Sequence, residues 1–232
     1  MLLEAVKTYG VVFGFNAILR GITMSKDLWL KRIRNYAGFL GGILPWISLL
    51  GAAIVHWNKP FEPGFWSNLS ISETYYITPA LTGILTAASI VLMCYDGYNL
   101  KDSLVTTLSG VFGLLIVLFP CRCAISPDIV GFFQLPVVTS NIIHCTAAVI
   151  FFCLLAYNSL FLFTKTDGNV TKQKKKRNIV YRICGIGMLA IMALMIIPVD
   201  FFAKTWFVEM GALTFFSFSW LTKGGAFGFL ND

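Results

Sequence analysis

The chain has 232 residues, of which 57% are hydrophobic and 12% are charged, and its formal net charge is +7 at pH 7. A soluble globular domain carries about a quarter charged residues. The composition therefore excludes an ordinary soluble domain and indicates a protein that lies in a lipid bilayer. The six cysteines do not indicate a disulfide framework, because four of them fall inside apolar runs, where cysteine behaves as a small hydrophobic residue.

The N-terminal residues 1–35 precede the first long apolar run. They contain an apolar stretch, residues 9–19, that is too short to cross a bilayer. A secretory signal is not indicated, because Glu4 precedes this stretch and Arg20 follows it. We therefore expect residues 1–35 to be a cytoplasmic or interfacial extension with an interfacial helix that turns its apolar side toward lipid.

Six apolar runs that could cross the membrane as helices follow. A bilayer core of roughly 30 Å takes about 20 mostly apolar residues, and a segment in lipid must satisfy its own backbone hydrogen bonds. The runs are residues 36–55, 77–95, 104–119, 137–163, 178–197 and 205–221. The sequence thus predicts an all-α fold, a polytopic membrane helix bundle of six transmembrane helices over residues 36–221, with a cytoplasmic tail at 222–232.

Lysine and arginine predict the orientation, because they concentrate on the cytoplasmic side of membrane proteins. Fifteen of the eighteen, all but Lys59, Arg122 and Lys204, lie on the side that would hold both termini. We therefore expect both termini in the cytoplasm, in a bacterial inner membrane or a eukaryotic endomembrane or plasma membrane. The basic run 172–177 lies in a short loop, where attraction to anionic lipid explains it. Membrane lipids are thus the predicted partners, with no nucleic acid, and the oligomeric state stays open, a homo-oligomer included.

Polar and ionisable residues gather in the outer half of the predicted bundle, where they are candidates for function. At about 1.5 Å per residue, His144 lies roughly 10 Å and Glu209 roughly 6 Å below the outer boundary. Asn141 shares the helical face of His144. The predicted ligand-binding residues are Ser70, Ser72, Glu73, Arg122, Asn141, His144 and Glu209. The alternative is a structural hydrogen-bond network in which Arg122 neutralises Glu73 or Glu209.

The same residues leave three functional classes open. Our leading hypothesis is a pocket that binds a lipid headgroup or a small polar ligand in membrane organisation or sensing. An intramembrane hydrolase acting on lipids is the second, because Ser72, His144 and a carboxylate supply the residue types of a serine nucleophile. A zinc version needs three protein ligands, and His56 would have to join His144, so we predict no metal and no cofactor. A small-solute carrier is the third, disfavoured because no internal repeat is evident.

Three short motifs occur in an order that resembles a known family. They are S-I-S-E at Ser70–Glu73, L-F-P at Leu118–Pro120 and I-H-C-T-A-A-V-I-F-F at Ile143–Phe152. The order is similar to that of the six-span membrane proteins related to the damage-regulated autophagy modulators and of similar bacterial membrane proteins of unknown function, over roughly residues 34–221. The resemblance implies six helices, a polar outer pocket around the serine motif and the histidine, and a role near lipids, without a settled enzymatic activity.

A more distant likeness is to the ceramidase and progestin-receptor type membrane hydrolases, which combine a serine, an aspartate and three histidines around zinc. This chain lacks the closing histidine pair of that group in its last apolar run, where residues 206–220 offer only Glu209. The departure places zinc hydrolysis in doubt even if the bundles are related.

Overall fold

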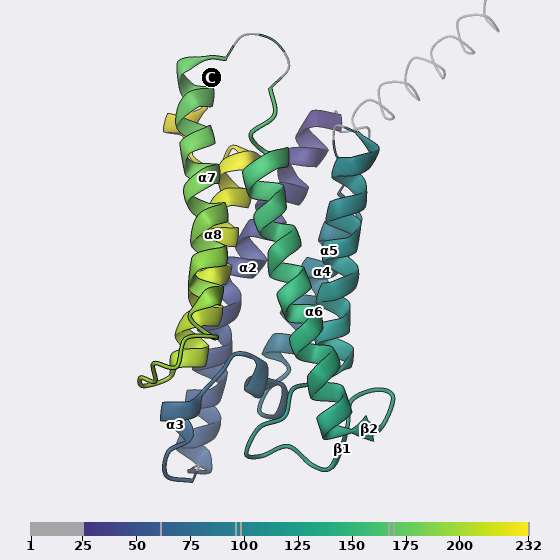
Figure 1. Cartoon of the computed structure of the whole chain (residues 1–232), viewed down its shortest axis with the longest axis vertical. Coiled ribbons are helices and arrows are strands. Elements are labelled where there is room, and N and C mark those ends of the chain that lie inside the picture. Colours follow the sequence, from purple (N-terminus) through teal and green to yellow (C-terminus); the bar gives the residue numbers. More distant parts are fainter. Residues whose placement is uncertain are drawn as a thin grey trace, which may run out of the picture.

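The computed structural model is a bundle of long helices that lie side by side (Figure 1). It describes residues 26–60, 62–95, 97, 99–166, 168 and 170–231, so the expected interfacial helix lies outside the described residues. The helices are α2 (Lys26–Asn58), α3 (Phe65–Asn68), α4 (Ala80–Met93), α5 (Leu100–Leu118), α6 (Val137–Tyr157), α7 (Lys172–Ala193) and α8 (Lys204–Gly224). The smaller elements are the 3₁₀ turns η1 (Ser72–Tyr76) and η3 (Gly228–Leu230), the π-helical turn η2 (Asn158–Leu162), and two antiparallel strands, β1 (Ile129–Val130) and β2 (Leu135–Pro136).

Each of the six apolar runs lies largely in one of the long helices. Among the described residues, three helices are long and apolar enough to cross a membrane, namely Leu28–Asn58, Leu100–Leu118 and Val137–Leu162. The shorter helix α4 is apolar and has no charged residue, whereas α7 and α8 carry charged residues near their ends. The fold is therefore a mostly helical bundle with three candidate membrane-spanning helices.

Several helices begin at other positions than the hydropathy predicts. Helix α7 begins at Lys172, six residues before the expected start, so the basic run 172–177 forms its first turns and is not a loop. Helix α2 begins at Lys26, ten residues before the expected start, so the predicted extension 1–35 overlaps its first turns. The second apolar run was expected to begin at Ile77, but α4 begins after Pro79 and the chain before it forms η1. Proline is well suited to the start of a helix because it has no N–H to leave unpaired.

The long helices form a closed ring in which each contacts the next, in the order α7, α8, α2, α4, α5, α6 and back to α7. Helix α2 approaches α8 closely because glycines of α2 face α8. A Cβ on Gly38 would lie 3.0 Å from the backbone nitrogen of Leu221, and one on Gly42 would lie 2.6 Å from Ser217 Oγ. Small residues allow such close packing of helices in membranes.

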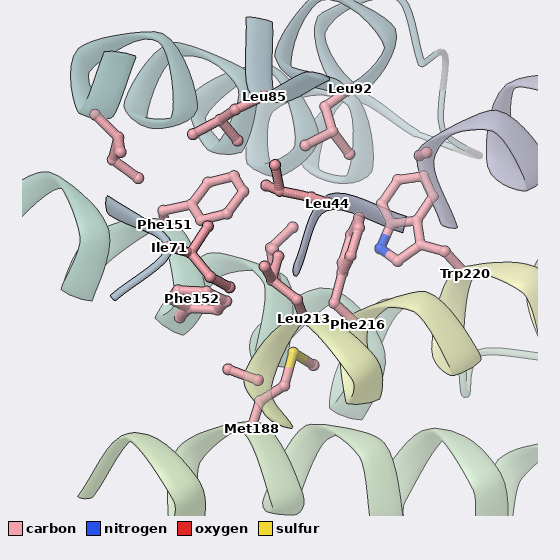
Figure 2. Close-up of a cluster of buried hydrophobic side chains, with 14 of the residues drawn as sticks. Leu44, Ile71, Leu85, Leu92, Phe151, Phe152, Met188, Leu213, Phe216 and Trp220 are labelled. Carbon is pink, nitrogen blue, oxygen red and sulfur yellow. The ribbon is translucent and has the colours of Figure 1, made fainter. Parts of the chain in front are cut away.

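The interior of the ring is filled by apolar side chains from opposite helices. Figure 2 shows Leu44, Leu85, Phe151 and Leu213 turned toward one another from α2, α4, α6 and α8, with Ile71 beside them. The loops with α3, β1 and β2 lie at the lower end of the bundle in Figure 1, and the C-terminus lies at the upper end. The two ends of the bundle therefore carry different connections, and the polar residues of interest divide between them.

Candidate functional site

The connection between α2 and α4 folds into the lower end of the bundle and is bonded to the start of α8. The backbone N–H of Ala203 donates to Ser67 O at 2.8 Å, and that of Trp206 donates to Leu69 O at 3.2 Å. Glu209 then accepts from the backbone N–H of Ile71, with 2.6 Å between nitrogen and Oε2. These bonds place Ser72, the first residue of η1, inside the ring of helices.

Ser72 links two residues that are distant in the sequence. Its hydroxyl donates to Glu209 Oε1 at 2.7 Å, and His144 Nε2 lies 3.1 Å from the same Ser72 oxygen. The structure thus brings together three of the predicted site residues from η1, α6 and α8. His144 is almost completely buried, with 4% of its surface exposed, whereas Ser72 and Glu209 are partly buried.

His144 is held by the carboxyl end of α5. In an α-helix the carbonyl of Ile116 would accept from the N–H of residue 120, but residue 120 is a proline and has no N–H. His144 Nδ1 takes that place, 3.1 Å from Ile116 O and 2.8 Å from Phe119 O. In the same way Ser140, one turn earlier in α6, donates its hydroxyl to Pro120 O at 2.8 Å.

These contacts determine how protons are shared within the group. Both partners of His144 Nδ1 are carbonyl oxygens, which only accept, so Nδ1 carries a proton. If the imidazole is neutral and Glu209 is ionised, Nε2 and Oε1 both require the single hydroxyl proton of Ser72. If one further proton is bound, on either His144 or Glu209, both contacts of the Ser72 hydroxyl become hydrogen bonds. Ser72 is therefore placed to relay a proton between the two.

A small cavity adjoins this group. It has a volume of about 40 Å³, and its lining is apolar except for Ser72 and Glu209. A buried water needs roughly 10–15 Å³ of such space, so the cavity has room for a few waters or a few methylene groups. The apolar lining residues are Leu44, Ile71, Leu81, Leu85, Ile116, Ala148, Phe151, Phe152 and Leu213, six of which are labelled in Figure 2. The cavity therefore has an apolar wall and one polar corner.

The other predicted residues lie near this group without joining it. Ser70 is buried and its hydroxyl accepts from the backbone N–H of Glu73 at 2.9 Å. Burial raises the pKa of the Glu73 carboxyl, against smaller lowering effects of hydrogen bonds from the Cys123 thiol and the Ser70 backbone. The amide oxygen of Asn141 accepts from the backbone N–H of Arg122 at 2.8 Å, and Arg122 itself is exposed.

Sequence reasoning did not identify the backbone acceptors of this site. Tyr76 donates its hydroxyl to Cys121 O at 2.8 Å, which joins η1 to the loop after α5. The sequence offers one signal for this region, the proline at 120, which leaves helix carbonyls without donors.

His56 packs edge-on against Trp66, and within the described ranges no three His, Cys, Asp or Glu side chains are grouped so that they could hold a metal ion.

Comparison with protein-family models, with curated proteins and with solved structures supplies no relative to set beside this site. The resemblance to the proteins related to the damage-regulated autophagy modulators therefore stays a prediction from three short motifs. No family model, no curated protein and no solved structure matches the chain.

Proposed function

We propose that this chain is a six-span membrane protein, with both termini in the cytoplasm, that binds a membrane lipid in the outer half of its bundle. The lipid headgroup would contact Ser72 and Glu209, with His144 behind them, and the adjoining part of its chain would enter the apolar cavity. The function would lie in membrane organisation or sensing.

The outward faces of the helices support the six-span arrangement. Helix α7 exposes Ile179, Ile183 and Ile186 at 58%, 58% and 61% of their surfaces, and this spacing of four and three residues follows one face of a helix. An apolar stripe of this kind is disfavoured in water but suits contact with lipid chains. Helix α7 is therefore proposed to cross the bilayer although its first turns are basic.

The polar corner of the apolar cavity is the observation that carries the lipid proposal. Ser72 and Glu209 are the polar residues in its lining, and a lipid likewise joins one polar group to an apolar chain. Pockets with mostly apolar walls and a few placed polar groups are typical of ligand sites. The cavity of about 40 Å³ suits the methylene groups next to a headgroup rather than a whole lipid.

Lipid analysis of the purified protein tests this proposal. The full chain and its Ser72→Ala and Glu209→Ala variants would be purified in mild detergent, and co-purified lipids would be identified by native mass spectrometry. We expect the wild type to retain one lipid class above its share of the membrane and both variants to lose it. Ser126→Ala is the control, because the bonds of the Ser126 hydroxyl to described residues lie within the outer loop, to Cys123. Unchanged lipid content in variants of lowered stability would contradict the proposal.

Serine-dependent lipid hydrolysis is a second candidate, favoured by the 3.1 Å between Ser72 Oγ and His144 Nε2. The hydroxyl of Ser72 would attack an ester carbonyl while Nε2 takes its proton, and that proton would pass to the departing alkoxide. Water would then release the acyl group from Ser72. A fluorophosphonate probe should label wild-type protein and not Ser72→Ala; absence of labelling together with absence of esterase activity would remove this candidate.

A further inference from the structure

The connection between α7 and α8 exposes a run of apolar side chains. Residues 194–202 read L-M-I-I-P-V-D-F-F, in which Asp200 is the single charged residue, and all nine are exposed. Ile196, Phe202 and Val199 expose 86%, 65% and 59% of their surfaces. A contiguous exposed apolar run of this kind marks an interaction surface. We call residues 194–202 the apolar connection.

The position of the apolar connection in the bundle indicates what it contacts. Figure 1 shows it in yellow-green, projecting sideways above the level of α3 and of the strands β1 and β2. Helix α3 follows the outer end of the candidate span Leu28–Asn58. In the proposed orientation, the apolar connection therefore lies nearer the bilayer centre than these other outer loops, and it projects toward the outer leaflet.

The exposed face of α7 continues into the apolar connection. The stripe that ends at Ile186 is followed by Ala190 and Ala193, which are also exposed and which keep the spacing of four and three residues that follows one helix face. Leu194, the first residue of the apolar connection, comes next. The face of α7 that is proposed to contact lipid thus extends without a break into the apolar connection, and a lipid surface would cover both.

Many backbone groups of the apolar connection are paired within the protein, as contact with lipid requires. The N–H groups of residues 194–196 each donate to the carbonyl three residues earlier, at 3.1 Å. Pro198 has no N–H to pair. The carbonyl of Ile197 accepts from the N–H of Val199 at 2.8 Å and from Lys204 Nζ at 2.9 Å. These bonds reduce the cost of placing a non-helical segment against lipid.

We propose that the apolar connection inserts into the outer leaflet of the bilayer and contacts its phospholipids. This inference rests on the proposed six-span arrangement, because it requires α7 to cross the membrane. Asp200 limits the depth, since a charged group in the hydrocarbon core is costly. Asp200 therefore lies among the headgroups, while the apolar side chains around it reach the first methylene groups of the acyl chains.

Insertion at this point would bring lipid beside the site around Ser72 and Glu209. The chain that follows the apolar connection is bonded to the segment before η1, because the N–H of Ala203 donates to Ser67 O at 2.8 Å. Glu209 lies in α8, which begins immediately afterwards. Outer-leaflet lipids that contact the apolar connection would thus lie next to the proposed lipid-binding site.

Photocrosslinking of the full chain tests the proposal. Benzoylphenylalanine would replace Phe202, and the protein would be irradiated in nanodiscs of phosphatidylcholine and weighed intact by mass spectrometry. We expect a mass increase of one phosphatidylcholine molecule. The same photoreactive residue in place of Ile183 reports on the exposed face of α7. In place of Glu62, which is exposed in the connection between α2 and α3, it should give little lipid adduct.

The three positions separate failure of this inference from failure of the six-span proposal. An adduct at position 183 without one at position 202 would overturn the insertion of the apolar connection and leave the span of α7 intact. Absence of lipid adduct at both positions would overturn both proposals. Equal yields at positions 62 and 202 would also overturn the insertion, because the two outer connections would then not differ in their contact with lipid.

A charge placed in the apolar connection gives a second test. Ile196→Asp should lower the thermal midpoint in nanodiscs, because a carboxylate is disfavoured among acyl chains. Phe132→Asp is the matched control, since Phe132 is 77% exposed and lies in the turn between β1 and β2, where we expect water. An unchanged or raised midpoint for Ile196→Asp would contradict the proposal, because an exposed apolar side chain in water is not needed for stability.

Discussion

The two ring nitrogens of His144 are predicted to have separable roles, and two substitutions can divide them. Nδ1 donates to carbonyls at the end of α5, whereas Nε2 faces Ser72 Oγ. The side-chain amide of asparagine can place an N–H near the position of Nδ1 but has no group at the position of Nε2. His144→Asn should therefore keep the contact with α5 and lose the contact with Ser72, while His144→Ala loses both.

The expected magnitudes follow from burial at this point. Ile116 is 5% exposed and His144 is 4% exposed, so a carbonyl that loses its donor here has little access to water. An unsatisfied buried group costs about 1–3 kcal/mol, and deletion of the ring leaves additional empty space. We expect His144→Ala to lower the free energy of unfolding by about 2–4 kcal/mol and His144→Asn by about 1 kcal/mol.

Two measurements on each variant would test this division of roles. Unfolding in mixed micelles of increasing dodecyl sulfate content gives the free energy of unfolding, and native mass spectrometry gives the lipid retained. We expect His144→Asn to fold stably and to lose the retained lipid. The reasoning would be refuted if both variants were equally destabilised, because Nδ1 would then not be the anchoring atom.

Three further predictions concern other residues. Glu209→Gln should change stability by less than about 0.5 kcal/mol, since its amide can donate to Ser72 and free the hydroxyl for His144; denaturation in micelles would measure this. Burial raises the pKa of Glu73 in the folded state. The protonated carboxyl therefore contributes stability at acidic pH, and this contribution is lost as the pH rises through the folded pKa. Glu73→Gln should flatten the dependence of the thermal midpoint on pH. Gly38→Ala should cost about 1–3 kcal/mol in an unfolding titration by forcing α2 away from α8, whereas a Cβ at Gly83 meets no atom within 4 Å and Gly83→Ala should not destabilise.

Hydropathy predicted the positions of the long helices because an uninterrupted apolar run in lipid has to satisfy its own backbone hydrogen bonds. It did not predict where α2 begins, because half of residues 26–35 are charged and the segment is nevertheless helical. Arg34 is 7% exposed and bonds to Tyr95, a contact between distant parts of the chain. Tertiary contacts of this kind extend a helix beyond the run that hydropathy detects.

The depth of residues in the bundle predicted part of the candidate site. It assigned His144 and Glu209 to one zone with the serine motif, and the structure brings both to Ser72. The alternative in which Arg122 neutralises a carboxylate also rested on depth, but Arg122 is exposed and the described contact is through its backbone N–H. The actual acceptors of His144 are backbone carbonyls, which every residue possesses and which no pattern of side chains reveals.

The distribution of contacts around Ser72 bears on whether the group is structural or functional. His144 Nδ1 donates to the carbonyls at the end of α5, and the backbone N–H of Ile71 donates to Glu209 Oε2. Neither of these hydrogen bonds involves His144 Nε2 or Glu209 Oε1, the two atoms that contact the Ser72 hydroxyl. If the group served packing alone, a serine or asparagine at position 144 could supply the donor to α5. The second nitrogen and the second carboxylate oxygen instead converge at the polar corner of a cavity, held in place by bonds that do not depend on a ligand, as binding a polar group there requires.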